Sequence, residues 1–593
     1  MEKITVIGIG RLGLCIALCF ESRGYDVMGV DLNDDYVNSL NEKTFKTTEP
    51  FVNSYLKQSK YFKATTNLKE GLDHSDLIFI IVPTPTLENS KNYDHSIVEN
   101  LLKKINSFQV SNKHLIITST VIPGFIVKTA KLLIQNCSNT FLAYNPEFIA
   151  QGTIIHDFLN ATLVLVGEEN KNTGDILFRL YEKVASNARI SRMSIESVEI
   201  AKIALNCFVT TKIAFANFIG DLADKTENAN KDQILFAIGN DQRIGNKCLK
   251  AGFGYGGPCF PRDNNALEYY ANSKGVIPFI PIATDESNNF HANFQFEELL
   301  KQNDPIVFEN VGYKDVCPVP IIEKSQKLVI ANKLVNEGRK VILVDYDIVL
   351  NEVKKEYKDK FTLVSKDRVF HKIFIIHYSK LKDRHAFMSQ QLLENKLNDI
   401  APIQWLDFFD RENTTQKQIE ENFKYNPSIC LRHLSIAEIA NYLGHMHAFE
   451  QIANDPTLLY GMIIEGDMIF KKDYVKNLEY ACKILPGDWD FLCIGGCYHG
   501  GIDCLKKNEY SETKPIIYKP SDYQTFTGNY IIRKEAAQRL LKVMKPFSLP
   551  IDSNLHELSR KLNLNVYWCR PILSVEESKT GKYESAITSE RGF

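Results

Sequence analysis

The chain begins with a stretch that decides its first fold: Lys3-Ile4-Thr5-Val6-Ile7-Gly8-Ile9-Gly10-Arg11-Leu12-Gly13. A short apolar strand runs into a glycine-rich turn, and a helical pattern follows from Leu14 to Ser22. A second strand, Asp26 to Val30, ends in Asp31. A glycine-rich turn in some other α/β domain is the alternative. The order strand, turn, helix, strand and acid favours a dinucleotide-binding Rossmann domain instead.

Each glycine of this turn has its own expected task. Gly8 would form the tight turn, and Gly10 would admit a pyrophosphate to the N-terminus of the helix. Gly13 would let the helix pack closely on the strand. Asp31 would bind the ribose hydroxyls of the adenosine, and its negative charge favours NAD over NADP.

Polar residues follow three further buried strands. Apolar runs at 77–82, 114–118 and 142–144 lead into segments that contain Thr84, Thr120 and Glu147-Phe148. Ligands of open α/β sheets bind at the carboxyl ends of parallel strands, which is where these residues would lie. Taken singly, each is more often a cap or turn residue. Together they predict a doubly wound sheet with a ligand site at one edge.

A second glycine-rich stretch carries the chemistry: Gly252-Phe253-Gly254-Tyr255-Gly256-Gly257-Pro258-Cys259-Phe260-Pro261-Arg262-Asp263. Glycines weaken regular structure, so this clustering indicates a backbone that approaches another group closely. Cys259 follows at once, and Asp263 stands four residues further on. The ordinary structural interpretation is a turn followed by a buried cysteine. A thiol beside an acid–base partner is typical of covalent catalysis.

The composition limits the remaining possibilities. At 593 residues the chain needs roughly three to five domains. With a net charge of -2, the chain has no strong electrostatic field that would attract nucleic acid or a membrane surface. No apolar run reaches the ~18 residues of a membrane span, and no signal peptide is recognisable. The thirteen scattered cysteines favour a reducing compartment without structural zinc. We therefore expect a cytoplasmic protein.

The motifs together resemble the UDP-glucose and GDP-mannose 6-dehydrogenase family. The cysteine stretch is similar to its GxGxGGxCxPKD loop, and the three strand ends are similar to its TPT, STV and NPEF segments. The resemblance implies that Thr84, Thr120 and Arg262 contact the NAD side of the site and that Glu147 serves acid–base chemistry. Two positions depart: Arg262 replaces a lysine, and Gln151 replaces a second glutamate that could take a proton.

A long predicted helix at 194–224 resembles the central dimer-forming helix of the same family. Lys202 and Asn206 share one face of it because they are four residues apart. A solvated lysine beside an asparagine is the ordinary explanation; the resemblance implies that both stabilise an oxyanion. Arg243, in a segment similar to DxRIG, would contact the sugar nucleotide, either within its own subunit or across a homodimer. The other implied substrate contacts are Phe148 and the loop residues Gly252, Phe253, Gly254, Tyr255, Gly256 and Gly257.

The resemblance implies a two-step oxidation of a nucleotide sugar at C6. The Cys259 thiolate would add to the aldehyde, a second hydride transfer would leave a thioester, and water activated through Asp263, Thr120 and Glu147 would release the carboxylate. General likeness favours UDP-glucose over GDP-mannose. A further unit from 305 to 367 resembles a truncated UDP-binding domain, with Glu323 where an arginine is usual.

The chain continues from His371 with a fresh α/β pattern. Its landmarks resemble the lipopolysaccharide- and collagen-type glycosyltransferases (family twenty-five), which implies a GT-A-like domain using a nucleotide sugar and a glycan or protein acceptor. Glu465 and Asp467, two apart at a strand end, would hold Mn²⁺ or Mg²⁺. Acidic turns are common, so the pair alone indicates little. Asp552 would activate the acceptor or, equally, cap a helix.

We therefore expect four domains. They are an NAD-binding Rossmann domain at 1–190, a helical dimerisation domain with the cysteine loop at 191–300, a truncated Rossmann-like domain at 301–367, and a glycosyltransferase at 370–593. Two alternatives stay open. The dehydrogenase part could be a degenerate scaffold that binds NAD and UDP-sugar, or only the transferase could be active.

Overall fold

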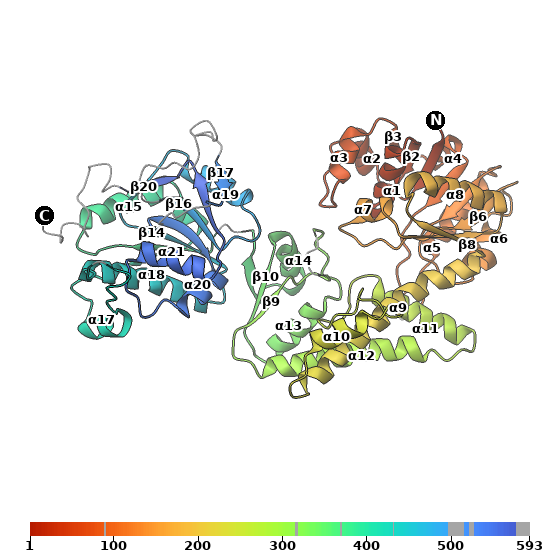
Figure 1. The fold of residues 1–593 in the computed structure, drawn as a ribbon. Helices are drawn as coiled ribbons and strands as arrows, with labels where there is room; N and C mark the ends of the chain where they lie inside the picture. The colour runs from red at the N-terminus through yellow and green to blue at the C-terminus, as the bar shows by residue number, and fades with distance from the viewer. Residues whose placement is uncertain are drawn as a thin grey trace. The chain divides into compact units, whose positions relative to one another are not determined.

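A computed structural model describes residues 1–87, 90–314, 318–367, 370–430, 432–495, 515–520 and 527–576. The chain forms two compact units, Met1–Leu363 and Val364–Phe593. Figure 1 shows both units, coloured from red at the N-terminus to blue at the C-terminus.

The first unit begins with an eight-stranded sheet in the order β3-β2-β1-β4-β5-β6-β7-β8. Neighbouring strands run parallel, except that β6 and β7 are antiparallel. The chain runs from β1 out to β3 and then returns beyond β1 to β4, so the strand order reverses between β1 and β4. Such a switch point opens a crevice at the carboxyl ends of the strands. The strands are β1 (Lys3–Ile7), β2 (Asp26–Val30), β3 (Phe62–Thr65), β4 (Leu77–Ile80), β5 (His114–Ile117), β6 (Phe141–Tyr144), β7 (Leu163–Glu168) and β8 (Arg189–Met193).

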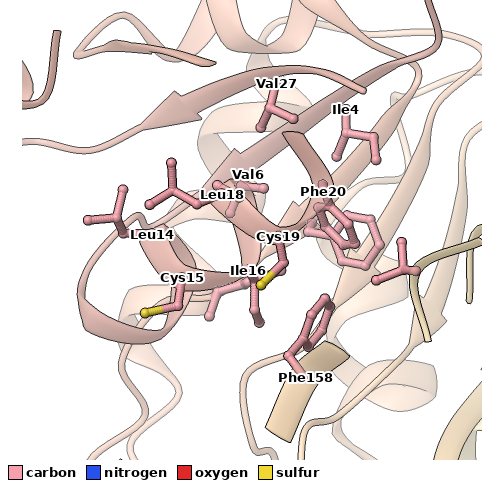
Figure 2. Packing of buried hydrophobic residues seen from close by; sticks show 14 of the residues in the cluster. Ile4, Val6, Leu14, Cys15, Ile16, Leu18, Cys19, Phe20, Val27 and Phe158 are labelled. Atoms are coloured by element: carbon pink, nitrogen blue, oxygen red, sulfur yellow. The ribbon is translucent and has the colours of Figure 1, made fainter. Parts of the chain in front are cut away.

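Helix α1 (Arg11–Ser22) is buried along most of its length. Figure 2 shows Leu14, Cys15, Leu18 and Cys19 packed among the strand residues and Phe158 of α7 (Ile154–Leu159). Burying an apolar side chain of this size contributes about 1.5–3 kcal/mol, so this packing fixes the turn that precedes α1. The other helices of the domain are α2 (Asp34–Asn41), α3 (Val52–Gln58), α4 (Leu68–His74), α5 (Ser96–Ser107), the π-helix η1 (Ile126–Ala130), α6 (Lys131–Leu133) and α8 (Lys171–Val184).

A 30-residue helix, α9 (Ile195–Asp224), leads out of the Rossmann domain. Ser194 caps it by accepting a hydrogen bond from the Ser197 amide at 3.3 Å. The helices α10 (Lys231–Gly239), α11 (Phe260–Ser273) and α12 (Phe279–Leu300) pack along it, as Figure 1 shows. The cysteine loop lies directly before α11, so α9 and α11 present their residues to the same region.

Helix α9 is long and apolar enough to cross a membrane, judged by length and composition alone. This differs from the expectation that no segment of the chain could span a membrane. A core helix of a soluble protein passes the same test. Here α9 buries residues such as Glu199, Lys202 and Asn217, which are not suited to lipid contact.

A small α/β subdomain completes the first unit. It has a three-stranded sheet in the order β11-β10-β9, flanked by two helices. Its core contains Phe308, Leu328, Leu343 and Val353. Its elements are β9 (Ile306–Glu309), α13 (Gln326–Asn336), β10 (Val341–Asp345), α14 (Asp347–Tyr357) and β11 (Thr362–Ser365).

The second unit is built on a nine-stranded mixed sheet. Ile373 and Ile375 of β12 (Lys372–Ile376) enter one apolar core, and Phe374 and Ile376 enter another. Alternate side chains of a strand point to opposite faces, so helices cover both faces of this sheet. The helices α18 (Ile436–Asn454), α20 (Lys534–Leu541) and α21 (Ile551–Lys561) contribute to the Phe374 core, and α15 (Lys382–Glu394) and α19 (Tyr474–Lys483) to the other.

The sheet combines parallel and antiparallel pairs. Strand β12 is parallel to β13 and β14, whereas β14 and β16 are both antiparallel to β18. The remaining elements are β13 (Ile403–Leu406), β14 (Tyr460–Glu465), β15 (Met468–Phe470), β16 (Phe491–Gly495), β17 (Ile516–Tyr518), β18 (Asn529–Arg533), β19 (Val566–Arg570), β20 (Ser574–Glu576), α16 (Leu397–Ile400) and α17 (Gln416–Asn422).

Candidate active sites

A cavity of about 400 Å³ in the first unit brings the strand ends, α9 and the cysteine loop together. The predicted catalytic residues of the first unit all line it, and so do residues predicted to bind cofactor or substrate: Thr120, Glu147, Phe148, Lys202, Asn206, Gly256, Cys259, Arg262 and Asp263. The departure Gln151 also lines it. The lining also includes residues to which the sequence analysis assigned no catalytic task, among them Arg11, Leu205, Val209 and Tyr313.

The geometry of the first glycine-rich turn fits a bound dinucleotide. Gly8 has φ +88°, and a Cβ on it would lie 2.4 Å from the Ile81 carbonyl oxygen. A Cβ on Gly13 would lie 2.0 Å from the Gly8 carbonyl oxygen. Gly10, in contrast, has nothing within 4 Å of its Cβ position, so the backbone there is open to a ligand at the N-terminus of α1.

Asp31 ends β2 at the edge of this turn. Its Oδ1 accepts hydrogen bonds from the backbone amides of Leu32 (2.8 Å) and Asn33 (3.3 Å), which orient the carboxylate. The chain's residues therefore fit NAD, whose pyrophosphate would lie at Gly10 and whose adenosine ribose would bind Asp31.

Two threonines link the ends of β4 and β5. The Thr84 hydroxyl donates a 2.7 Å hydrogen bond to the Thr120 carbonyl oxygen. The Arg262 guanidinium in turn donates to the Thr84 carbonyl oxygen at 3.3 Å. The strand ends are thus tied to the segment that follows Cys259.

Asp263 is fully buried in the first turn of α11. Its Oδ2 accepts a 2.6 Å hydrogen bond from Asn206 Nδ2. Its Oδ1 accepts from the Tyr93 hydroxyl at 2.9 Å and from Arg262 Nε at 3.3 Å. A buried carboxylate needs such donors, because burial without partners is strongly unfavourable. Tyr93 carries no motif that sequence reasoning could have used.

Lys202 projects from α9 into the same cavity. Its Nζ donates a 2.6 Å hydrogen bond to the Glu147 carbonyl oxygen and lies 4.6 Å from the centre of the Phe148 ring. Burial lowers the pKa of Lys202, and the nearby Asp263 and Cys259 partly oppose this change. Asn206 lies one turn further along the same face of α9, so the Lys202 ammonium and the Asn206 amide both face the cavity.

Burial raises the pKa of Glu147 to about 7, although Tyr181 and Lys202 stabilise its charged form. The Tyr181 hydroxyl is 3.0 Å from Glu147 Oε1. A carboxyl group that titrates near neutral pH can both accept and return a proton, which suits acid–base work.

Cys259 caps the N-terminus of α11. Its side chain is exposed to the cavity, yet the surrounding protein still disfavours the thiolate and raises the pKa of Cys259. Arg262 and Lys202 lower that pKa, while Asp263 raises it. Because a thiolate is a stronger nucleophile than a thiol, these two cations favour the reactive form of Cys259.

The glycines of the cysteine loop approach protein atoms. A Cβ on Gly254 would lie 2.4 Å from Asn288 Oδ1, one on Gly256 2.0 Å from the Lys324 carbonyl oxygen, and one on Gly257 2.5 Å from the Tyr313 ring. Gly252 alone has open space around its Cβ position. As predicted, this backbone approaches other atoms closely. At three of the four glycines the neighbouring atoms belong to α12 or to the small subdomain.

Other residues expected to bind substrate lie around this loop. Tyr255 is buried and bonded to Asp285, and the Phe253 ring lies 6.0 Å from Phe308. Arg243 lies outside the cavity; its side chain is 88% exposed and pairs with Asp241 at 2.6 Å. Glu323 contacts the loop through its backbone, since its carbonyl oxygen accepts a 3.0 Å hydrogen bond from the Gly257 amide.

The second unit has a cavity of about 130 Å³ at the ends of β12 and β14. Both predicted metal ligands, Glu465 and Asp467, line it. Its wall also contains two arginines, Arg384 and Arg411, together with Tyr378, His377 and Asn441. A cavity that combines arginines and carboxylates suits a diphosphate and a cation.

Glu465 is held by a buried pair. His445 Nε2 lies 3.0 Å from Glu465 Oε1, and His445 Nδ1 lies 2.7 Å from the Tyr530 hydroxyl. Burial disfavours the charged form of Glu465, but the hydrogen bond and charge of His445, together with hydrogen bonds from Asn441 and Thr527, outweigh burial, and the pKa of Glu465 is lowered. This places an ionised carboxylate at the cavity.

A further acid, Glu576 at the end of β20, carries no motif that sequence reasoning could have used. Burial and the carboxylates of Glu465, Asp467 and Asp552 raise the pKa of Glu576 to about 8. Negative charge is thus in excess here, which fits a divalent cation. In the residues that the structure describes, no group of three or more His, Cys, Asp or Glu side chains is arranged as a metal site. Two carboxylates with substrate phosphates can still hold Mg²⁺ or Mn²⁺.

Two further details of the second unit concern Gly466, which lines this cavity, and Asp552, which is not among its lining residues. A Cβ on Gly466 would lie 2.6 Å from His377 Nδ1, so a side chain at this position would collide with that ring. Asp552 is not the N-cap of α21, because Pro550 occupies that position. Its carboxylate lies in the first turn and accepts a 2.7 Å hydrogen bond from the Ser553 amide.

Known families match the chain in three segments. Residues 2–185 match the NAD-binding domain of the UDP-glucose/GDP-mannose dehydrogenase family, and residues 196–290 match its central domain. Residues 370–555 match glycosyltransferase family 25 (LPS biosynthesis protein).

Individual relatives agree with the first two matches. The chain is 30% identical to the UDP-glucose 6-dehydrogenase AglM of Haloferax volcanii over 60% of this chain and 85% of that protein. It is 27% identical to a GDP-mannose 6-dehydrogenase of Pseudomonas putida over 60% of this chain and 84% of the other. A UDP-glucose dehydrogenase structure from Pyrobaculum islandicum shares the fold, with a TM-score of 0.57 and 24% identity over 62% of this chain and 87% of that one.

These matches agree with the Rossmann domain, the central helices and the separate C-terminal unit described above. The chain therefore belongs to the UDP-glucose/GDP-mannose dehydrogenase family and joins an NAD-dependent nucleotide-sugar dehydrogenase to a glycosyltransferase family 25 domain.

Proposed function

We propose that the first unit oxidises UDP-glucose at C6 to UDP-glucuronate through a thioester on Cys259. One observation carries the proposal: Cys259, Lys202, Asn206 and Asp263 line a single cavity. The dinucleotide turn supplies the neighbouring site for NAD, which accepts both hydrides.

The reaction consumes one alcohol, two NAD⁺ and one water, and it yields one carboxylate, two NADH and three protons. In the first step a base removes the hydroxyl proton while a hydride leaves C6. The Cys259 thiolate then adds to the aldehyde carbon, and loss of the second hydride leaves a thioester. Water finally attacks the thioester carbon, the C–S bond breaks, and the thiolate is restored.

The chain's own residues have distinct tasks in this scheme. Lys202 and Asn206 hold the oxyanion at C6, because both are hydrogen-bond donors on one face of α9. Glu147, with a pKa near 7, takes protons at the strand ends. Asp263 and Thr120 orient the attacking water.

General likeness of the motifs favours UDP-glucose, whereas relatives that act on UDP-glucose and on GDP-mannose match the chain to a similar extent, so both sugars belong in the test. Purified chain is mixed with NAD and either sugar nucleotide, and NADH is followed by absorbance. Two NADH per UDP-glucose support the proposal. NAD binding without NADH from either sugar would instead favour the scaffold alternative, which the departures Gln151 and Glu323 support.

For the second unit we propose metal-dependent sugar transfer from a nucleotide sugar. Glu465 and Asp467 would hold the cation, which neutralises charge on the leaving diphosphate. Arg384 and Arg411 would contact the same phosphates. Asp552 is the proposed base for the acceptor hydroxyl. Loss of transfer in EDTA and recovery with Mn²⁺ would support this assignment.

We also propose that the first unit forms a homodimer through α9. Large apolar side chains on this helix are exposed: Phe208 (67%), Phe215 (49%), Phe218 (55%) and Leu222 (55%). Such a stripe is unfavourable in water unless another surface covers it. In a dimer, Arg243 could reach the partner's cavity. Light scattering on wild type and Phe215→Asp tests this, and a monomeric wild type would contradict it.

A further inference from the structure

We propose that Tyr93 is a positioning residue for Asp263 in the dehydrogenase reaction, an inference that rests on the proposed function of the first unit. Tyr93 lies in the loop between β4 and α5, and 170 residues separate it from Asp263. Its hydroxyl donates a 2.9 Å hydrogen bond to Asp263 Oδ1. The sequence motifs assign no task to it.

Tyr93 contacts the two charged residues in the segment after Cys259, Arg262 and Asp263. Besides its bond to Asp263, its ring lies 5.1 Å from the guanidinium carbon of Arg262, the distance of a cation–π contact. Arg262 donates to Asp263 Oδ1 and to the Thr84 carbonyl oxygen. The ring and the hydroxyl of one residue therefore hold the arginine and the carboxylate.

The position of Tyr93 is itself firmly set. The side chain is 1% exposed and packs with Ile203 of α9 and Ala266 of α11. Its backbone forms an antiparallel bridge with Thr86, which closes the base of the loop. At the loop, Lys91 forms an ion pair with Glu268 of α11 at 2.6 Å. The hydroxyl is thus fixed relative to both helices.

The hydroxyl can act only as a donor here. Burial, and then the negative charge of Asp263, raise the pKa of Tyr93 well above its ordinary value, so the phenol keeps its proton. Asp263 Oδ2 is held by Asn206 at 2.6 Å. Without the phenol, Oδ1 would retain only the longer 3.3 Å bond from Arg262. The carboxylate could then rotate about its bond to Asn206.

Rotation of Asp263 would impair one step in particular. During hydrolysis the attacking water, oriented by Asp263, gives a proton to Glu147 while the new C–O bond forms and the C–S bond to Cys259 breaks. Both hydride transfers precede this step. Removal of the phenol should therefore slow release of the acid and leave formation of the thioester less affected.

The variant Tyr93→Phe tests this, because it keeps the ring against Arg262 and removes only the hydroxyl. Tyr25→Phe is the matched control, since Tyr25 is also buried (5% exposed) and belongs to the core around α1. NADH is recorded in a stopped-flow instrument with full-length chain, NAD and the active sugar nucleotide. Melting temperature and NAD affinity are measured on the same samples.

For Tyr93→Phe we expect kcat to fall about tenfold or more, as for loss of a hydrogen bond to a charged group, with kcat/KM for the sugar nucleotide nearly unchanged. A burst of two NADH per site should precede the slow steady state, and Tyr25→Phe should behave as wild type. If Tyr93→Phe kept the kcat of wild type and showed no burst, or if only its KM or melting temperature changed, the role of Tyr93 would be overturned while the proposed reaction stood. A wild type that makes no NADH would remove the proposed reaction and this inference with it.

Discussion

Lys202 Nζ donates its 2.6 Å hydrogen bond to the backbone carbonyl oxygen of Glu147 rather than to the carboxylate of that residue. A neutral acceptor orients the ammonium without cancelling its charge. The positive charge is therefore available to an oxyanion in the cavity, beside the amide of Asn206.

Replacing Lys202 with methionine removes this charge while keeping most of the side-chain volume. We expect kcat to fall by about 10²–10³-fold, the usual effect of deleting one oxyanion donor, with NAD affinity retained. Lys113→Met is a matched control, because Lys113 also donates to a backbone carbonyl, that of Ser75 at 2.9 Å, away from the cavity. Steady-state NADH formation makes the comparison. Equal losses in both variants would contradict a role for Lys202 in the oxyanion site.

Cys259→Ser should bind NAD and nucleotide sugar but make no acid, because the hydroxyl is a far weaker nucleophile than a thiolate. Isothermal titration measures binding, and product analysis measures turnover. Cys248→Ser serves as the control, since Cys248 is also an exposed cysteine but does not line the cavity. Wild-type acid formation by Cys259→Ser would disprove the thioester scheme.

The charge of Arg262 should set the reactivity of Cys259. Arg262 lowers the pKa of this thiol against the effect of burial, so Arg262→Gln should raise that pKa. At pH 7.5 or so, alkylation of Cys259 by iodoacetamide should slow about tenfold, and the pH profile should move to higher pH. Arg262→Lys keeps the charge and should stay near wild type. Peptide mass spectrometry reads both sites, and the rate at Cys248 serves as an internal standard.

Glu199 predicts a pH-dependent stability. Its fully buried carboxylate accepts hydrogen bonds from the amides of Gly124 (2.5 Å) and Ile126 (3.0 Å), yet burial raises the pKa of Glu199 to about 7. The folded state then binds a proton that the unfolded state has already lost between pH 4.5 and 7. The contribution of Glu199 to stability is therefore greatest at low pH and declines as pH rises to 7.

Comparison with Glu199→Gln isolates this effect. Between pH 5 and 8 the unfolding free energy of wild type should fall relative to that of the variant by roughly 3 kcal/mol. Urea unfolding of both proteins at several pH values measures the difference. A constant difference across this range would show that Glu199 is ionised throughout.

In the second unit, Glu465→Gln should abolish sugar transfer and weaken Mn²⁺ binding, because the carboxylate held by His445 loses its charge. Glu450→Gln, on the exposed side of α18, is the control. NADH formation by the first unit should be unchanged in both variants. Unaltered Mn²⁺ affinity in Glu465→Gln, measured by titration, would exclude Glu465 as a ligand.

Features that depend on neighbours in sequence were predictable from the residues. The strand at 3–7 was placed correctly, and the helix after it ends at Ser22 as predicted but begins at Arg11 instead of Leu14. Helix α9 begins one residue after its predicted start and ends at Asp224, as predicted. Lys202 and Asn206 were expected on one face because helical periodicity fixes that relation. The same local patterns indicated the small subdomain and the start of the second unit.

Contacts between distant segments were decided by the tertiary structure. Tyr93 meets Asp263 across 170 residues, and Glu576 approaches Glu465 and Asp467 only because β20 pairs with β15. The cysteine-loop glycines pack against Asn288, Lys324 and Tyr313, which the sequence did not indicate. Spacing in sequence encodes the period of a helix or strand, whereas long-range partners arise from how sheets and helices pack. Sequence spacing determined which chemistry this chain carries, and long-range packing determined which residues hold the reactive groups in place.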